Sequence, residues 1–337
     1  MTEADLDELL STPRPETVEA LRQCPGDIIV LGAGGKMGPT VARMAARAAN
    51  QIGDGRRVYA VSRFSSAQAA LALGAAGIDT ITCDLLDRDA VARLPDVPNV
   101  IFMAGQKFGT ADAPATTWAM NTIVPAICAE RYRGARIVAF STGNVYPLTP
   151  VAQGGAGEAD AVSPVGEYAS SALGRERVFE FYSMRNRTPV AIIRLNYAID
   201  LRYGVLADIG LRVWRDEAVP VAMGYVNVIW QGDACRIAIE SLGRAAVPPF
   251  ILNVTGGETL AVREIAQAFA TELGKSPRFE GKEQRDALLS NTDRMRSLFA
   301  APEVDVATMI HWIADWIRDD GSMLGKPTHF EERAGKF

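Results

Sequence analysis

The stretch "VLGAGGKMGPTVA", residues 30–42, decides the fold of this chain. It follows the apolar run "DIIVLG" and precedes a pattern with helical periodicity, so its glycines stand between a strand and a helix at Gly-x-x-Gly-x-x-Gly spacing: Gly32, Gly35 and Gly38. Glycine permits the positive φ of a tight turn and lets the backbone approach a pyrophosphate, whose charge faces the N–H groups at the helix start. The stretch therefore predicts a dinucleotide site, with a purely structural glycine turn as the alternative.

Strand-like apolar runs alternate with helical patterns as far as residue 196. The strand-like runs are residues 27–32, 58–63, 79–84, 99–105, 135–142 and 190–196. The helical patterns between them are residues 39–49, 66–77, 117–132 and 174–184. This alternation predicts an α/β fold, a doubly wound parallel sheet of the Rossmann type with helices on both faces.

The pattern changes on either side of this region. Residues 1–25 predict a leader helix packed on the main domain. Residues 26–196 form the predicted dinucleotide-binding domain, to which residues 225–255 return. We expect the remainder to form a smaller substrate-binding part made of residues 197–224 and 256–337.

Composition narrows the class of protein. The chain has 337 residues, 48% of them hydrophobic, and a net charge of −5. Its acidic start differs from a signal peptide and no run of eighteen apolar residues occurs, so we expect a cytoplasmic protein with no membrane partner. No basic face for nucleic acid is evident. The scattered cysteines and the two histidines, His311 and His329, predict neither disulfides nor a metal site.

The end of the second predicted strand bears on the choice of cofactor. An acidic residue usually binds the ribose hydroxyls there, but "VYAVSRF" has Ser62 followed by Arg63. A guanidinium can pair with a 2′-phosphate, and Lys36 in the glycine turn adds a second cation. These residues predict NADP as the cofactor. NAD is the alternative, since Arg63 could instead stack on adenine.

Further motifs follow in a fixed order along the chain. They are "CDLLD" with Asp84, "FMAG" with Gly105, "WAMNTIVPA" with Asn121, "FSTGNVYP" with Thr142 and "EYASSALGRE" with Tyr168. Together with the glycine turn they resemble an extended short-chain dehydrogenase/reductase of the NAD-dependent epimerase/dehydratase branch. "RLNYA" and residues 250–275 continue the resemblance. Turn formation or backbone hydrogen bonding is the structural alternative for each polar residue.

The resemblance implies an oxidoreductase or isomerase of carbohydrate metabolism, and a homodimer. It implies that Tyr168 moves the proton of the substrate hydroxyl, that Thr142 holds the reacting oxygen and that Asn121 lies in the helix beneath. The cofactor-binding residues that we expect are Gly32, Gly35, Lys36, Met37, Gly38, Ser62, Arg63, Asp84, Leu85, Ala104, Gly105 and Tyr168.

One residue of the family pattern is missing. The lysine of Tyr-x-x-x-Lys, which in the family lowers the phenol pKa and bonds the nicotinamide ribose, is replaced by Ala172. Arg175 lies on the same stripe of a helix and could supply the cation, so we include it among the catalytic candidates. Alternatively, Arg175 pairs with surface acids. A lysine restored at position 172 would be expected to face the phenol.

The substrate side also departs from the family pattern. Nucleotide-sugar members carry an arginine for the diphosphate where "YVNVIWQGD" has Val226 and Asn227. We therefore expect a sugar, a sugar acid or a similar polyhydroxylated small molecule. The substrate-binding candidates are Ser141, Asn144, Asn196, Arg202 and Tyr203. Because the lysine is missing, a dinucleotide-binding sensor or scaffold without hydride transfer is the alternative function.

Overall fold

A seven-stranded parallel sheet forms the centre of the computed structural model, which describes residues 1–337 except 65, 108, 110–111, 327 and 337. The strand order is β3-β2-β1-β4-β5-β7-β12. The strands are β1 (Ile28–Leu31), β2 (Val58–Ser62), β3 (Asp79–Thr82), β4 (Asn99–Phe102), β5 (Arg136–Thr142), β7 (Val190–Leu195) and β12 (Phe250–Val254). The predicted doubly wound Rossmann-type fold is confirmed. The order reverses between β1 and β4, which is where such sheets bind ligands.

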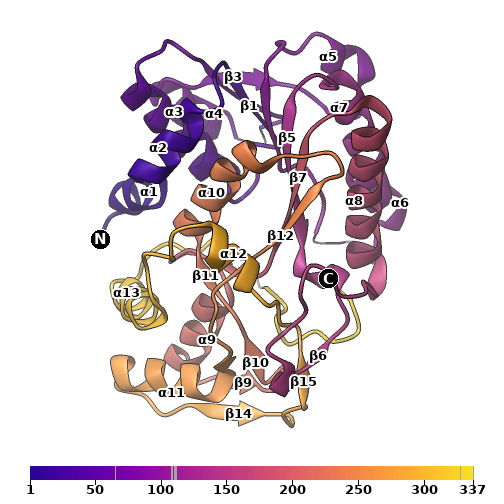
Figure 1. The fold of residues 1–337 in the computed structure, drawn as a ribbon. Coiled ribbons are helices and arrows are strands. Elements are labelled where there is room, and N and C mark those ends of the chain that lie inside the picture. Colours follow the sequence, from indigo (N-terminus) through magenta and orange to yellow (C-terminus); the bar gives the residue numbers. More distant parts are fainter. Residues whose placement is uncertain (65, 108, 110–111, 327, 337) are drawn as a thin grey trace.

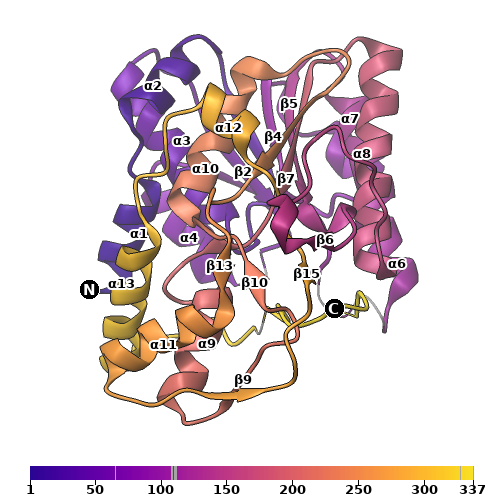
Figure 2. The ribbon, with the colours of Figure 1, turned by 60° about the horizontal axis from the view of Figure 1, so that its bottom comes forward.

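Helices cover both faces of the sheet (Figures 1 and 2). One face carries α3 (Gly38–Ile52) and α10 (Gln231–Glu240), and the other carries α5 (Arg88–Ala92), α7 (Val124–Arg131) and α8 (Gly166–Asn186). The short helix α4 (Ala67–Ala75) joins β2 to β3. Every residue of β1 and β4 is buried, as expected for strands between two helical layers.

The leader segment forms two helices, α1 (Glu3–Ser11) and α2 (Pro15–Arg22), which pack on α3 and α10. Thr2 and Asp5 form a capping box at the start of α1. Leu6 and Leu10 of α1 are fully buried in the hydrophobic core of the carboxy-terminal part. The leader segment therefore contacts both parts of the molecule.

Three helices, α9 (Val205–Trp214), α11 (Val262–Leu273) and α13 (Val306–Arg318), pack together as the centre of the smaller part. The remaining short strands are β6 (Thr149–Pro150), β8 (Ala198–Ile199), β9 (Ala218–Pro220), β10 (Tyr225–Val226), β11 (Ile229–Trp230), β13 (Leu260–Ala261), β14 (Arg278–Glu280) and β15 (Asp286–Ala287). The short helix α12 (Asp293–Leu298) packs on β12 of the main sheet. Among the described residues, no helix has both the length and the apolar character needed to cross a membrane.

Two predicted helices have different bounds in the structure. The pattern 117–132 is divided into α6 (Pro114–Trp118), a π turn (Ala119–Ile123) and α7. Pro125 has no N–H to donate to the carbonyl of Asn121, so the normal helical ladder is interrupted there. The pattern 174–184 is only the second half of α8, which begins before Tyr168.

Candidate active site

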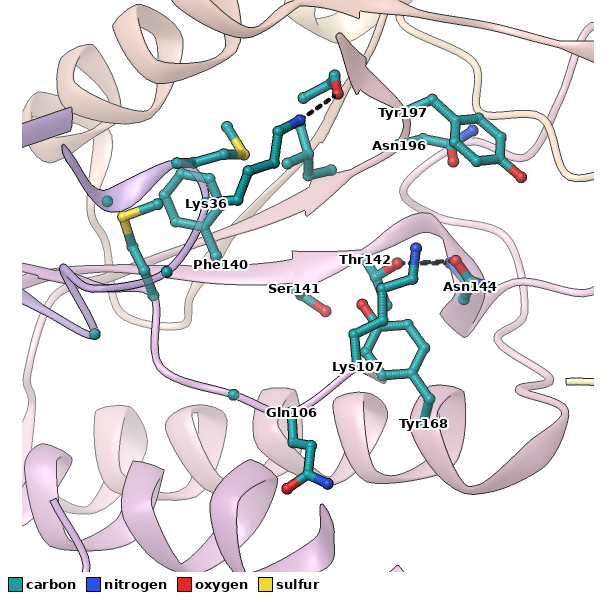
Figure 3. A pocket seen from close by; sticks show the side chains of 18 of the residues that line it. Lys36, Gln106, Lys107, Phe140, Ser141, Thr142, Asn144, Tyr168, Asn196 and Tyr197 are labelled. Carbon is teal, nitrogen blue, oxygen red and sulfur yellow. Dashed lines mark hydrogen bonds between the residues drawn. The ribbon is translucent and has the colours of Figure 1, made fainter. Parts of the chain in front are cut away.

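A cavity of about 300 Å³ lies at the carboxyl ends of β1, β4, β5 and β7 (Figure 3). The glycine turn lines one end, and Thr142 and Tyr168 line the other. The sequence-predicted residues on its wall are Gly32, Gly35, Lys36, Met37, Gly38, Gly105, Ser141, Thr142, Asn144, Tyr168, Arg175, Asn196 and Tyr203. Residues that the sequence did not single out complete it: Met103, Gln106, Lys107, Phe140, Leu195, Tyr197, Ala198, Gly204 and Thr328.

The glycine turn fits a dinucleotide pyrophosphate. Gly32 has φ +91°, and a Cβ there would lie 2.5 Å from the backbone nitrogen of Ala104. A Cβ on Gly35 would meet only a carbonyl at 3.4 Å, so the space above that residue is open. Helix α3 has no side-chain cap and no acidic residue in its first turn, which leaves its first N–H groups for an anion.

The residues expected at the adenosine end lie outside the cavity, at the ends of β2 and β3. The Ser62 hydroxyl accepts a backbone N–H two residues later, at 3.3 Å. Arg63 is exposed and, among the described residues, forms no ion pair. Asp84 accepts a backbone N–H at 3.0 Å, a turn contact that leaves its second oxygen exposed, while Leu85 is buried in the core.

Thr142 and Tyr168 form the polar end of the cavity. The Thr142 hydroxyl donates to Asn144 Oδ1 at 3.0 Å and is also hydrogen-bonded to the Tyr168 phenol. Burial raises the pKa of Tyr168 above its usual value, although the bond to Thr142 and the charge of Arg175 oppose the shift. The phenol is therefore neutral at pH 7 and can donate a proton.

Arg175 and Asn121 brace the cavity wall. Arg175 is buried, its Nη1 donating to the Phe140 carbonyl at 2.9 Å and its Nη2 to Asn121 Oδ1 at 2.5 Å. Asn121 also accepts from the Gln106 N–H and donates to the Gln106 carbonyl, each at 3.0 Å. Arg175 thus lies beside the cavity rather than among surface acids. The two side chains hold the loop after β4.

Ala172 faces away from this arrangement. It is fully buried in a small apolar cluster with Val145, Tyr146 and Ala156. The position that would carry the family lysine is therefore occupied by hydrophobic packing.

Two of the substrate candidates are engaged with the protein itself. The Ser141 hydroxyl donates to Glu176 at 2.6 Å, and Glu176 forms a buried ion pair with Arg194 at 2.7 Å. Asn196 donates to Asn227 Oδ1 at 3.2 Å and to a backbone carbonyl. Both side chains still line the cavity, but their hydrogen bonds fix strand ends and loops.

Of the adjacent residues Arg202 and Tyr203, only Tyr203 lines the first cavity. Arg202 pairs with Asp200 at 2.8 Å and lines a second cavity instead of the first. Tyr203 borders both cavities, with its ring 4.0 Å from Lys36 Nζ. Lys36 also donates to the Ala198 carbonyl at 3.0 Å, and burial lowers its pKa to about 7.

Lys107 is the main residue that sequence reasoning missed. It lies two positions beyond Gly105, in the loop after β4, and burial lowers its pKa to about 8. The signal in the sequence was a basic residue two positions after Gly105, the last residue of the motif "FMAG". With Lys36 and Arg175 it gives the cavity three cationic side chains, and no carboxylate lines it among the described residues.

Comparisons with known proteins give structural matches only. No protein-family model matches this chain, and a search of curated proteins finds no match. Among solved structures, a dTDP-glucose 4,6-dehydratase from Streptomyces venezuelae with NAD and TYD bound matches at a TM-score of 0.74 and 20% identity, over 87% of this chain and 97% of that one. The fold is shared.

Two further structures agree with it. A UDP-glucose 4-epimerase from Thermus thermophilus in complex with NAD has a TM-score of 0.70 and 20% identity, over 87% of this chain and 99% of that one. Pal from Bacillus thuringiensis has a TM-score of 0.71 and 19% identity, with the same coverage of both chains. The fold expected from the resemblance is thus confirmed across nearly the full length of these proteins.

Proposed function

We propose that this protein is an NAD(P)-dependent oxidoreductase or epimerase that acts on a sugar, a sugar acid or a similar polyhydroxylated small molecule. The observation that carries this proposal is the hydrogen-bonded pair Thr142 and Tyr168 in the same cavity as the glycine turn. A proton donor beside a dinucleotide site is what reduction of a carbonyl to an alcohol requires.

The residues divide the chemistry between them. The nicotinamide, when bound, supplies or accepts a hydride. Thr142 orients the substrate oxygen, and Tyr168 gives or takes its proton. Asn144 accepts the Thr142 proton at 3.0 Å, which fixes the Thr142 oxygen beside the Tyr168 phenol.

NADP is the proposed cofactor. The end of β2 carries Ser62 and no acidic residue, which removes a repulsion from a 2′-phosphate. A Cβ on Gly34 would collide with the Ser62 side chain, so the turn lies tightly against this strand end. The exposed Arg63 next to it is available for a bidentate pair with the phosphate.

The carboxy-terminal segment supports a small substrate. Thr328 lines the cavity and is held by Asp208, to which its backbone N–H donates at 2.8 Å. Farther on, Arg333 is anchored to the Asp286 carbonyl at 2.9 Å, and Gly335 packs directly against the start of α8. The segment is therefore fixed at both ends where it borders the cavity.

Little room remains on the side of this segment that faces Asn144 and Tyr197, although the second cavity, of about 290 Å³, lies on the side of Arg202 and Tyr203. The adjoining space, which shares Asn144 and Tyr197 with the main cavity and is bordered by Arg333, measures only about 40 Å³. A nucleotide diphosphate attached to a sugar would need much more. Val226 and Asn227 are also buried away from the cavity, so neither replaces the arginine of nucleotide-sugar enzymes.

A homodimer is part of the proposal. Large apolar side chains are exposed on the neighbouring helices α6 and α8 and the π turn between α6 and α7: Trp118, Ile123, Phe181 and Met184. A second copy of this face would cover them. Sedimentation velocity should give about twice the monomer mass.

Dinucleotide binding without hydride transfer remains the second candidate, favoured by the apolar packing of Ala172. Fluorescence titration with NADPH and NADH tests the cofactor. Turnover is tested on a panel of sugars, sugar acids and UDP-sugars, by nicotinamide absorbance for oxidoreduction and by chromatographic separation of isomers for epimerisation. We expect tighter NADPH binding and turnover of a small sugar or sugar acid. Tight binding of NADPH with no turnover of any compound would support the second candidate, and no binding of either dinucleotide would contradict both.

A further inference from the structure

The loop after β4 carries a lysine into the polar end of the cavity. Two hydrogen bonds from Asn121 fix the backbone of Gln106, each at 3.0 Å. Gly105 lies so close to the Arg175 guanidinium that a Cβ would collide with it. Lys107 therefore follows a firmly held backbone, although it lies in a loop.

In the view of Figure 3, the side chain of Lys107 points toward Thr142 and Asn144. These three residues and Tyr168 line the same cavity. The amine thus points toward the end of the cavity that the phenol and the threonine hydroxyl line, where a substrate oxygen would bind.

The second candidate cation, Arg175, is hydrogen-bonded to the protein itself. Arg175 directs its Nη groups at the Phe140 carbonyl, 2.9 Å away, and at Asn121 Oδ1, 2.5 Å away. Its charge acts on Tyr168 from behind the wall, and an arginine is a poor proton carrier. Lysine can both carry a charge and exchange a proton.

We propose that Lys107 is a catalytic residue, whose ammonium takes over from the loop after β4 the role of the lysine that α8 lacks. The inference rests on the proposed function. It assigns Lys107 to proton exchange at the oxygen held by Thr142 and Tyr168, and leaves Arg175 as a positioning residue for the loop.

The proton balance follows directly. In the reductive direction, a bound dinucleotide would supply the hydride, and Tyr168 gives its proton to the substrate oxygen. Lys107 returns a proton to the phenolate and becomes neutral, and then regains a proton from solvent. Oxidation of the alcohol runs through the same steps in reverse.

The electrostatic surroundings support this division of roles. Burial raises the pKa of Tyr168 and lowers that of Lys107 to about 8, with Asp208 opposing the shift of the lysine. Near neutral pH the lysine therefore titrates more readily than the phenol. Other charged or titratable groups line the cavity: Arg175 from α8, Tyr197 and Tyr203 before α9, and Lys36 at the end formed by the glycine turn. Below pH 8 the ammonium can donate, which favours reduction, and above pH 8 the amine can accept, which favours oxidation.

The test uses the full-length protein and has two parts. The chain has six lysines, so ¹³C-methylated lysine side chains can be titrated individually by NMR. We expect Lys107 to titrate near pH 8 and Tyr168→Phe to shift it by about 0.5 pH unit or more. The exposed Lys282 is the internal control. An unchanged Lys107 titration in Tyr168→Phe overturns the inference, whether or not any substrate has been found.

The second part is kinetic. Lys107→Met should lower kcat about a hundredfold or more with little change in KM, and should flatten the pH dependence near 8. Lys107→Arg should keep substrate binding but not restore kcat, and Lys282→Met is the matched control. If Lys107→Met raises KM with kcat intact, the lysine anchors a substrate anion and the inference is wrong. If the wild-type protein turns over no compound, the proposed function is wrong. The NMR titration still shows whether Lys107 and Tyr168 are coupled.

Discussion

The two ends of the cavity are built in different ways. The glycine turn comes from one continuous stretch, residues 32–38, and its fit depends on backbone N–H groups and missing side chains. The polar end is assembled from four separate segments that contribute Lys107, Thr142, Tyr168 and Thr328. Local spacing therefore specifies the first end, whereas tertiary packing specifies the second.

This difference separates binding from chemistry. A backbone site tolerates many sequences provided that the glycines remain, because N–H groups do not depend on side-chain identity. A side-chain site changes when any one contributing segment changes. In the proposed site, Ala172 packs in an apolar cluster and the cation comes from Lys107 on another element.

The largest effect should come from Tyr168→Phe. This change removes the proton donor but keeps the ring, so turnover should fall by about 10²- to 10⁴-fold while NADPH affinity stays within roughly twofold. Steady-state kinetics and fluorescence titration measure the two quantities. Such a result would show that the polar end can lose its chemistry while the glycine turn still binds the dinucleotide.

The opposite outcome is equally informative. Full activity in Tyr168→Phe on a substrate that the wild-type protein turns over would mean that the phenol does not carry the proton. A parallel loss of dinucleotide affinity would mean that the two ends are not independent.

Gly105→Ala should have the next largest effect. The new methyl group would displace the Arg175 guanidinium from Asn121, at a cost in unfolding free energy of about 2 kcal/mol, because a buried charged hydrogen bond is broken. The loop carrying Lys107 would lose its support. The melting temperature and the turnover rate should both fall.

Gly134→Ala is the matched control for Gly105→Ala. A Cβ there would meet nothing within 4 Å, and Gly134 lies away from the cavity. If the two variants melt at the same temperature, the brace between Arg175 and Asn121 does not hold the loop.

The fold could be predicted almost completely from the sequence. All six expected strands occur, because apolar runs bounded by turns are characteristic of buried parallel strands. The pattern 174–184 covers only the second half of α8, whereas the stripe that joins Ala172 and Arg175 already placed the first half on a helix. Gly174 is explained by packing: a Cβ there would lie 2.9 Å from Thr122, so glycine lets α8 approach the π turn closely.

The site could be predicted only in part. Glycine spacing led to the turn, and the family motifs led to Thr142 and Tyr168, all of which line the cavity. Lys107 could not be placed, because nothing in a loop sequence states where a long side chain points. Arg202 illustrates the same limit, since its ion pair with Asp7, at 3.2 Å and far away in the sequence, is a tertiary property.

Ala172→Lys should destabilise the protein without raising its activity. The side chain at 172 packs with Val145, Tyr146 and Ala156, so a lysine would overfill an apolar cluster. We expect a loss of about 1–3 kcal/mol in unfolding free energy. Ala172→Met is the control for volume without charge, and denaturant unfolding is the measurement. A gain in turnover would instead show that the family position can still serve the phenol.

The smallest effect should come from Arg333→Ala in the carboxy-terminal segment. Its guanidinium holds the Asp286 carboxylate at 2.5 Å and the Asp286 carbonyl at 2.9 Å, and it is partly exposed. Losing these bonds should cost less than about 1 kcal/mol, because partly exposed ion pairs are weak. Longer ligands could then displace the segment. We therefore expect the ratio of kcat/KM for a small substrate to kcat/KM for an extended one to fall by roughly two- to fivefold. Lys336→Ala, an exposed change on the same segment, is the control. An unchanged preference would mean that the limit on substrate length lies inside the cavity, among the side chains that surround Thr142 and Tyr168, and that the segment only covers it.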